Sequence, residues 1–162
     1  MINSNEDGRS HNPEVQALKA LKTLASMDKN APRAATQKIN LIQTPDEKEA
    51  TQCLQAAVNL GYARVQDFQV DITALGYAAL AASGFGSEFA KAVVGAVYQS
   101  LAFSERRPGY HIPQKSPFQW FAKTYGTVNG FQAGMHYALH VGWLTMGPNG
   151  GLALTAEGIK QV

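Results

Sequence analysis

Apolar residues recur at helical spacing in the first third of the chain. Residues 13–27 predict a first helix, since their apolar positions lie three or four apart: Val15, Leu18, Leu21, Leu24 and Ala25. Pro32 suits the first turn of a second helix that runs to about Asn40. The segment Thr44-Pro45-Asp46-Glu47 combines an N-cap threonine, a proline at the first helical position and a glutamate three residues after the cap. A third helix is therefore expected to begin there.

The second half of the chain predicts the same kinds of element in the same order. An apolar helical pattern covers Glu88–Phe103, and a loop rich in Arg, Pro and Gly follows it. Ser116-Pro117-Phe118-Gln119 has the form of a capping box that opens a short helix to Tyr125. A third helix then spans about Thr127–Val141. Residues 83–86, which read Ser-Gly-Phe-Gly, are expected to join two units.

One segment pattern occurs twice, about half a chain apart. In each copy a predicted helix ends at a glycine, Gly61 or Gly142, and an aromatic residue opens a short extended run. A turn and a second strand follow, with Gln66-Asp67-Phe68 as the first turn and Gly147-Pro148-Asn149-Gly150-Gly151 as the second. Both copies then reach a threonine, Thr73 or Thr155, whose hydroxyl can cap the next helix.

These repeated residues resemble a known superfamily. Leu154-Thr155-Ala156-Glu157-Gly158 matches the Leu-Thr-x-x-Gly segment by which the wing returns in winged helix-turn-helix proteins of the MarR and PadR kind, and Ile72-Thr73-Ala74-Leu75-Gly76 matches with Ile for Leu. The resemblance implies a mainly α fold with small β-hairpins (α+β), built as two tandem winged helix-turn-helix units. We expect an N-terminal disordered arm at 1–12, a first unit at 13–83 and a second at 84–162.

Composition fits a globular protein that has few surface charges. The 162 residues are 45% hydrophobic but only 16% charged, with a net charge of +2. Residues 1–82 contain eight Lys or Arg and nine Asp or Glu, whereas residues 83–162 contain six and three. The start is polar and acidic and no stretch approaches membrane-spanning length, so we expect a cytoplasmic protein that does not contact a membrane.

Two polar helical stripes are the candidate recognition faces, because the third helix of a helix-turn-helix protein presents its outer side to the major groove. Asn and Gln can read adenine edges, and His can donate to guanine or phosphate. A polar outer face is also what any surface helix shows. The first stripe is Lys48, Gln52, Gln55 and Asn59, opposite Leu54, Ala57 and Val58; the second is Asn129, Gln132, His136 and His140, opposite Phe131, Met135, Ala138 and Leu139.

Charge favours the second unit as the DNA contact. DNA affinity depends on Lys and Arg near phosphates, but the wing tips are Gln66-Asp67 and Pro148-Asn149, and Arg64 is the sole basic residue nearby. Three carboxylates lie at the start of the predicted third helix of the first unit, where they would repel phosphates: Asp46, Glu47 and Glu49. The second unit offers basic and hydroxyl side chains for the backbone: Arg106, Arg107, Lys115, Lys123, Thr124, Tyr125 and Thr127.

Glycines recur every four residues along the predicted third helix of the second unit, at Gly126, Gly130 and Gly134, and Ala138 continues the row. Each interior glycine costs about 1 kcal/mol relative to alanine in a helix, so a structural reason is expected. The close approach of another backbone, or of a bulky aromatic such as Trp120, would supply it.

No catalytic or cofactor motif is found, so we expect no enzyme and no cofactor. His136 and His140 have metal-ligand spacing but no third ligand nearby, so no native metal site is expected. The single cysteine, Cys53, excludes an internal disulfide and is predicted to be a small core residue.

These expectations lead to a functional hypothesis with alternatives. We predict a protein that binds double-stranded DNA, a transcriptional regulator of bacterial or mobile-element origin. The alternative is a protein-binding tandem winged-helix adaptor, or an inhibitor of a nucleic-acid machine. An enzyme with a site between the units is a third, weaker hypothesis, and a homodimer stays open.

Overall fold

The computed structural model describes residues 12–26, 47–66, 69–125 and 128–162. The expected second helix at Pro32–Asn40, residues 44–46 of the expected capping box and most of the expected N-terminal arm lie outside these ranges. The described chain is mainly helical with two small antiparallel strand pairs, which confirms the α+β class. Contacts divide it into two compact units, Met1–Leu80 and Ala81–Val162. The division falls within a helix, α4, rather than at residues 83–86.

In the first unit, two helices of equal length pack against each other. Helix α1 (Pro13–Ala25) is capped by Asn12, whose side chain accepts hydrogen bonds from the backbone N–H groups of Glu14 and Val15. Helix α3 spans Glu47–Asn59. Their buried apolar side chains form the core of the unit: Ala17, Ala20, Leu21, Leu24 and Ala25 from α1, and Ala50, Cys53, Leu54, Ala56 and Ala57 from α3.

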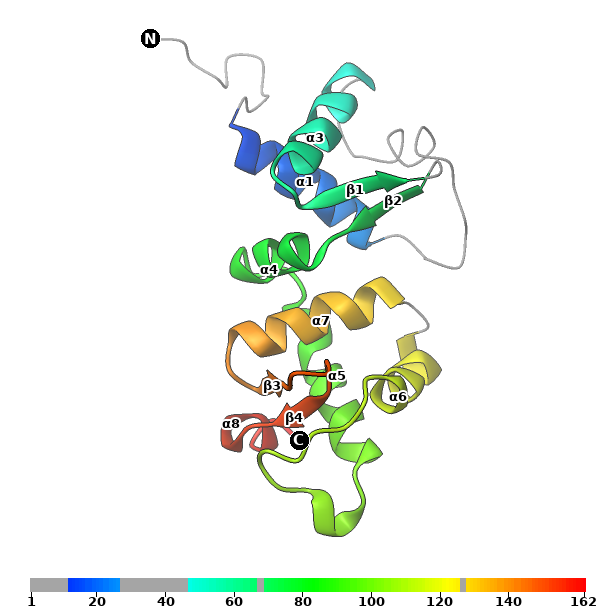
Figure 1. Ribbon diagram of the computed structural model, residues 1–162, viewed down its shortest axis with the longest axis vertical. Helices are drawn as coiled ribbons and strands as arrows, with labels where there is room; N and C mark the ends of the chain where they lie inside the picture. The colour runs from blue at the N-terminus through cyan, green and yellow to red at the C-terminus, as the bar shows by residue number, and fades with distance from the viewer. Residues whose placement is uncertain (1–11, 27–46, 67–68, 126–127) are drawn as a thin grey trace. The chain divides into compact units, whose positions relative to one another are not determined.

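A hairpin follows in the first unit, and a further helix contains the division between the two units. Strand β1 (Ala63–Gln66) pairs with β2 (Gln69–Ile72), and Ala63 lies opposite Ile72. The turn residues 67 and 68 lie outside the described ranges. Helix α4 (Ala74–Ala82) follows directly, as Figure 1 shows.

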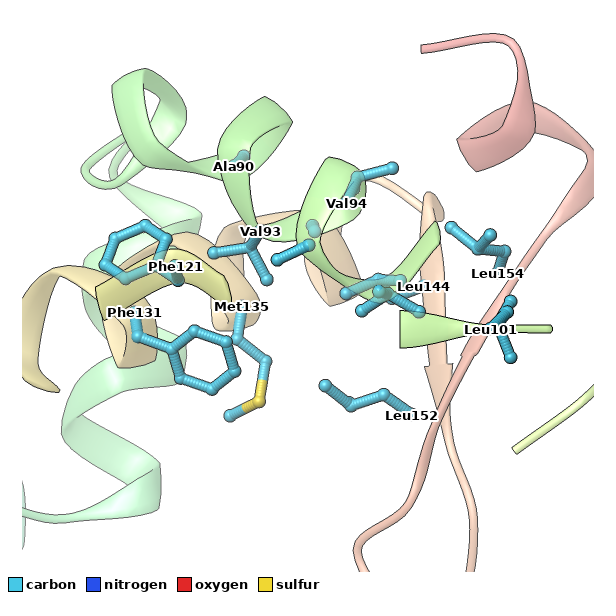
Figure 2. Packing of buried hydrophobic residues seen from close by; sticks show 13 residues of the cluster. Ala90, Val93, Val94, Leu101, Phe121, Phe131, Met135, Leu144, Leu152 and Leu154 are labelled. Atoms are coloured by element: carbon cyan, nitrogen blue, oxygen red, sulfur yellow. The ribbon is translucent and has the colours of Figure 1, made fainter. Parts of the chain in front are cut away.

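The core of the second unit is rich in aromatic residues. The unit consists of α5 (Ser87–Ser100), the 3-10 turn η1 (Phe103–Glu105), α6 (Lys115–Tyr125), α7 (Val128–His140), β3 (Leu144–Met146), β4 (Leu152–Leu154) and α8 (Ala156–Ile159). Side chains from α5, α6, α7 and the hairpin converge on one cluster, shown in Figure 2. Its labelled members are Ala90, Val93, Val94, Leu101, Phe121, Phe131, Met135, Leu144, Leu152 and Leu154.

Two predicted helix boundaries in the second unit were wrong. Helix α5 ends at Ser100 and not at Phe103, because Leu101 turns into extended backbone to enter the core. Helix α6 begins at Lys115, so Ser116 is not its N-cap. The first turn extends back to Gln114, whose carbonyl accepts the N–H of Phe118 at 3.0 Å. Pro117 is tolerated there, because the N–H groups of a first turn have no intrahelical partner.

The duplicated segment forms the same hydrogen bonds in both units. Gly61 and Gly142 have φ angles of 78° and 83°, a left-handed conformation that ends each helix. The next residue bonds back to the helix, from Tyr62 N to Ala57 O at 2.9 Å and from Trp143 N to Ala138 O at 2.8 Å. A helix stop of one kind therefore precedes both hairpins.

Each hairpin then returns to this helix stop through its threonine. The hydroxyl of Thr73 donates to the carbonyl of Gly61 at 2.6 Å, and that of Thr155 donates to the carbonyl of Gly142 at 2.5 Å. Both hydroxyls also accept a backbone N–H three residues later, from Gly76 at 3.1 Å and from Gly158 at 3.0 Å. The predicted threonine caps are thus confirmed, and each also joins the helix stop to the helix that follows the hairpin.

Candidate nucleic-acid interface

The stripe of α7 lies opposite the core of the second unit. Phe131, Met135 and Ala138 are buried, which orients the other side of the helix outward. Asn129, Gln132 and His136 are half-buried and His140 is exposed. Desolvation lowers the pKa of His136 below its usual 6.5, so this imidazole is neutral at pH 7. It can exchange hydrogen bonds but contributes no positive charge at that pH.

The structure explains the glycine row of α7 at one of its positions, Gly134, by the expected close approach of another backbone. A Cβ on Gly134 would lie 2.8 Å from the Cβ of Phe89 and 2.9 Å from its carbonyl carbon and oxygen. Helix α5 therefore approaches α7 at backbone distance, while Trp120 remains 44% exposed. Gly130 and Ala138 are also buried, and Gly126 lies outside the described residues.

The stripe of α3 is the more exposed of the two. Lys48, Gln52, Gln55 and Asn59 are all exposed, and the Nε2 of Gln55 donates to the Oδ1 of Asn59 at 2.8 Å. Part of this stripe forms one wall of an open groove of about 560 Å³ beside α1. Among the residues that the structure describes, none that lines the groove is charged; the lining is Pro13, Gln16, Gln52, Gln55, Ala56, Asn59 and Leu60.

One of the three carboxylates that were expected to repel DNA from α3 lies elsewhere. Glu49 is only 2% exposed, and its Oε1 lies 3.4 Å from the Nζ of Lys19 on α1. The expectation that it crowds the outer start of α3 is therefore wrong. The helical pattern did not reveal this, because the partner lies 30 residues earlier in the chain.

The turn between β3 and β4, residues 147–151, was predicted to be a wing and is called the wing turn below. It has polar neighbours that the sequence did not indicate. The Nε2 of Gln114 donates to the carbonyl of Gly150 at 2.8 Å. The ring of His111 packs against Gly147, and Ile112 pairs with Leu152 in an isolated antiparallel bridge. The tip residues Pro148 and Asn149 are uncharged, and the nearest basic residue along the chain from this contact is Lys115, which directly follows Gln114. The side chain of Lys115 is exposed.

Arg106 and Arg107 are not brought together with this wing turn. The N–H of Gly109 bonds to the carbonyl of Leu154, which places the loop at the opposite end of β4. Arg106 is half-buried, and its Nε donates to the carbonyl of Tyr98 at 3.2 Å. Its guanidinium carbon lies 4.4 Å from the centre of the Tyr98 ring and 5.2 Å from that of Phe103. The wing turn therefore gains no charge from this loop.

The remaining predicted contacts are divided between the units. Lys123 is exposed in the last turn of α6, and its Nζ lies 4.6 Å from the centre of the Trp120 ring. Thr127 lies outside the described residues. Arg64 is exposed on β1, directly opposite Asp71 in the strand register. In the second unit, Lys123 lies in the last turn of the helix that precedes α7. In the first unit, the carboxylate residue Asp71 is the cross-strand partner of Arg64.

Two other features bear on chemistry. Cys53 is fully buried, and burial followed by the charge of Glu49 raises the pKa of its thiol. This direction opposes nucleophilic activation. Within the described ranges, no three His, Cys, Asp or Glu side chains are placed to share a metal ion. No helix in these ranges combines the length and apolar character needed to cross a bilayer.

Comparison with known proteins identified no family model, curated protein or solved structure that matches this chain.

Proposed function

We propose that the protein binds double-stranded DNA, as a transcriptional regulator built from two winged helix-turn-helix units, with the second unit making the main contact. The element order of that unit supports the proposal. A first helix, the extended residue Ile112, two helices and a hairpin follow one another, and Ile112 bridges to Leu152 in the hairpin. This is the order of helix, strand, helix pair and wing in such units. A regulator of bacterial or mobile-element DNA would act in the cytoplasm.

The observation that carries the proposal is the hydrogen bond from Gln114, the residue before Lys115, to Gly150 in the wing turn. In a winged helix, the recognition helix enters the major groove and the wing lies along the adjoining backbone. Gln114 ties the start of α6 to Gly150, so in the complex Lys115 would lie where a wing meets phosphate. Lys123 occupies the other end of α6, where the chain turns into α7. The two lysines would hold the backbone while the α7 stripe faces the bases.

A salt-dependent titration tests this proposal. A fluorescein-labelled duplex is titrated with the full chain at low and at moderate salt, and anisotropy is recorded. We expect affinity to fall steeply with salt, and Lys115→Ala and Lys123→Ala each to reduce the salt slope by about 1. Lys160→Ala is the matched control, because that exposed lysine pairs with Glu157 in α8, away from the wing turn. Absence of duplex binding at low salt would reject the proposal.

A protein-binding adaptor remains the second candidate function, and the groove of the first unit favours it. Its carboxamides both donate and accept hydrogen bonds, and its described lining residues carry no charge, which suits a protein surface better than phosphate. Under this alternative the chain does not bind duplex. The parent chain would then form a complex with its protein partner that sedimentation velocity detects, and a Gln52→Ala/Gln55→Ala variant would not form it. Under the leading proposal the same variant keeps its duplex affinity.

A further inference from the structure

We propose that the loop Ala102–Tyr110 of the second unit is a binding site for single-stranded nucleic acid, in which unpaired bases stack on Phe103. The loop lies at the opposite end of β4 from the wing turn, so this site is separate from the proposed duplex contact. The ring of Phe103 is 86% exposed, more than any other large hydrophobic side chain of the described residues. The flat face of this aromatic ring is therefore accessible for stacking on a ligand.

Local hydrogen bonds hold Phe103 in one place. It opens the single 3-10 turn η1, in which the N–H of Glu105 bonds to the carbonyl of Ala102 at 2.8 Å. The carboxylate of Glu105 accepts the N–H of Ala102 at 3.0 Å. The loop backbone is therefore ordered before any ligand binds, which lowers the entropy that binding would otherwise cost.

The two arginines give the aromatic site a positive side. The guanidinium of Arg106 lies between the Tyr98 and Phe103 rings, at 4.4 and 5.2 Å from their centres. Arg107 is exposed, and its guanidinium carbon lies 6.0 Å from the centre of the Tyr110 ring. Aromatic rings interleaved with arginines are the usual elements of a surface that follows a single strand. The rings face bases and the guanidinium groups face phosphates.

The one carboxylate in the loop is directed toward the loop itself. Hydrogen bonds from Tyr110 and from the backbone of Ala102, with the nearby charge of Arg107, lower the pKa of Glu105. The same contact raises the pKa of Tyr110. Its phenol therefore stays protonated and donates a hydrogen bond to the carboxylate of Glu105. Glu105 thus stays ionised while its charge is used in fixing the loop. One net positive charge remains on the loop, from Arg106 and Arg107 against Glu105.

The aromatic platform favours a single strand over a duplex. Base faces in a duplex are covered by their neighbours in the stack, so a ring on the protein surface reaches them only where the strand is unpaired. Stacking on an aromatic side chain contributes affinity for any base, because every base has a flat face. The ligand class is therefore an unpaired stretch of DNA or RNA, with little preference for sequence.

Anisotropy titration of the full chain with a labelled oligothymidylate tests the inference. We expect binding that Phe103→Ala weakens about tenfold and that Phe103→Trp retains. Ser104→Ala is the control, since it changes an exposed residue of the same turn without removing a ring. Duplex affinity should be unchanged in Phe103→Ala, and this separates the inference from the proposed duplex function. An unchanged melting temperature confirms that the variant folds.

Two outcomes would overturn the inference. In one, the oligothymidylate does not bind at low salt. In the other, Phe103→Ala binds it as well as the parent chain. Loss of a self-associated species in Phe103→Ala, together with no oligothymidylate binding, would assign the loop to a protein contact instead.

Discussion

The two units share a hairpin junction but differ in how their helix pairs pack. When Gly61 is aligned with Gly142, Glu49 and Cys53 of α3 take the positions of Gly130 and Gly134 of α7. In the second unit, glycine lets the backbone of Phe89 come close to α7. In the first unit, a buried carboxylate meets Lys19 of α1 at 3.4 Å. The hairpin junction depends on close backbone contacts that few residue types allow. The helix–helix interface, by contrast, is packed with different residue types in the two units.

Aromatic residues are divided just as unevenly. Of the 2 Trp, 6 Tyr and 7 Phe residues, all except Tyr62, Phe68 and Tyr77 lie in the second unit. Among the described residues, every cation lying over an aromatic ring is also in that unit. The first unit instead exposes uncharged carboxamides along a groove. The two units thus present surfaces with different chemistry, and each prediction below tests one side of this difference.

The largest effect is expected at the glycine that both junctions share. A Cβ on Gly158 would overlap the carbonyl oxygen of Trp143, and a Cβ on Gly76 would overlap that of Tyr62. Because backbone cannot move aside easily, Gly158→Ala and Gly76→Ala should each lower the free energy of unfolding by about 3 kcal/mol. Urea denaturation measures this. Gly95→Ala is the control, since it meets no atom within 4 Å and should raise stability by about 0.5–1 kcal/mol.

Gly134→Ala tests the part of the comparison that concerns helix packing. The added methyl would press on the backbone of Phe89, so the free energy of unfolding should fall by about 2 kcal/mol. The aligned change Cys53→Ala removes a buried sulfur without overpacking and should cost about 1 kcal/mol. Equal losses in the two variants, measured by urea denaturation, would mean that the two helix interfaces do not differ in this way.

The threonine hydroxyls should contribute less than the glycines but equally in the two units. Thr73→Ala and Thr155→Ala each remove one helix cap and one bond to the helix stop, so each should cost about 1–2 kcal/mol. Thr→Ser at either position keeps the hydroxyl and should recover most of the loss. Thermal melts of the four variants provide the measurement. A loss at Thr155 alone would show that the first junction is not held by its threonine.

The smallest effect concerns pH and the α7 stripe. Burial lowers the pKa of His136 below its unfolded value of 6.5, so the folded state binds fewer protons than the unfolded state. This contribution to stability is complete above the unfolded pKa and is lost as the pH falls through the folded pKa. His136→Gln, which installs the residue of the aligned position Gln55, should flatten the dependence of stability on pH as the pH falls below the unfolded pKa of 6.5. Urea midpoints that remain equally pH-dependent would contradict this.

Local patterns predicted the features that depend on a few neighbouring residues. The helix stops at Gly61 and Gly142, the hairpins and the threonine caps all follow from turn and capping chemistry within about 15 residues. The burial of Glu49 and the bond from Gln114 to Gly150 depend on partners 30 and 36 residues away, which no periodicity indicates. The start of α6 was misplaced for the same reason, because Gln114 is anchored through its distant partner.

The most direct test of the proposed difference between the two units is to map the duplex contact on the full chain by NMR. Amide signals are followed while a duplex is added at low salt. If the second unit is the main contact, the signals of α7, of residues 144–154 and of Lys115 should shift, while those of α3 and β1 remain in place. Shifts confined to α3 and β1, or the absence of any shift, would contradict the account.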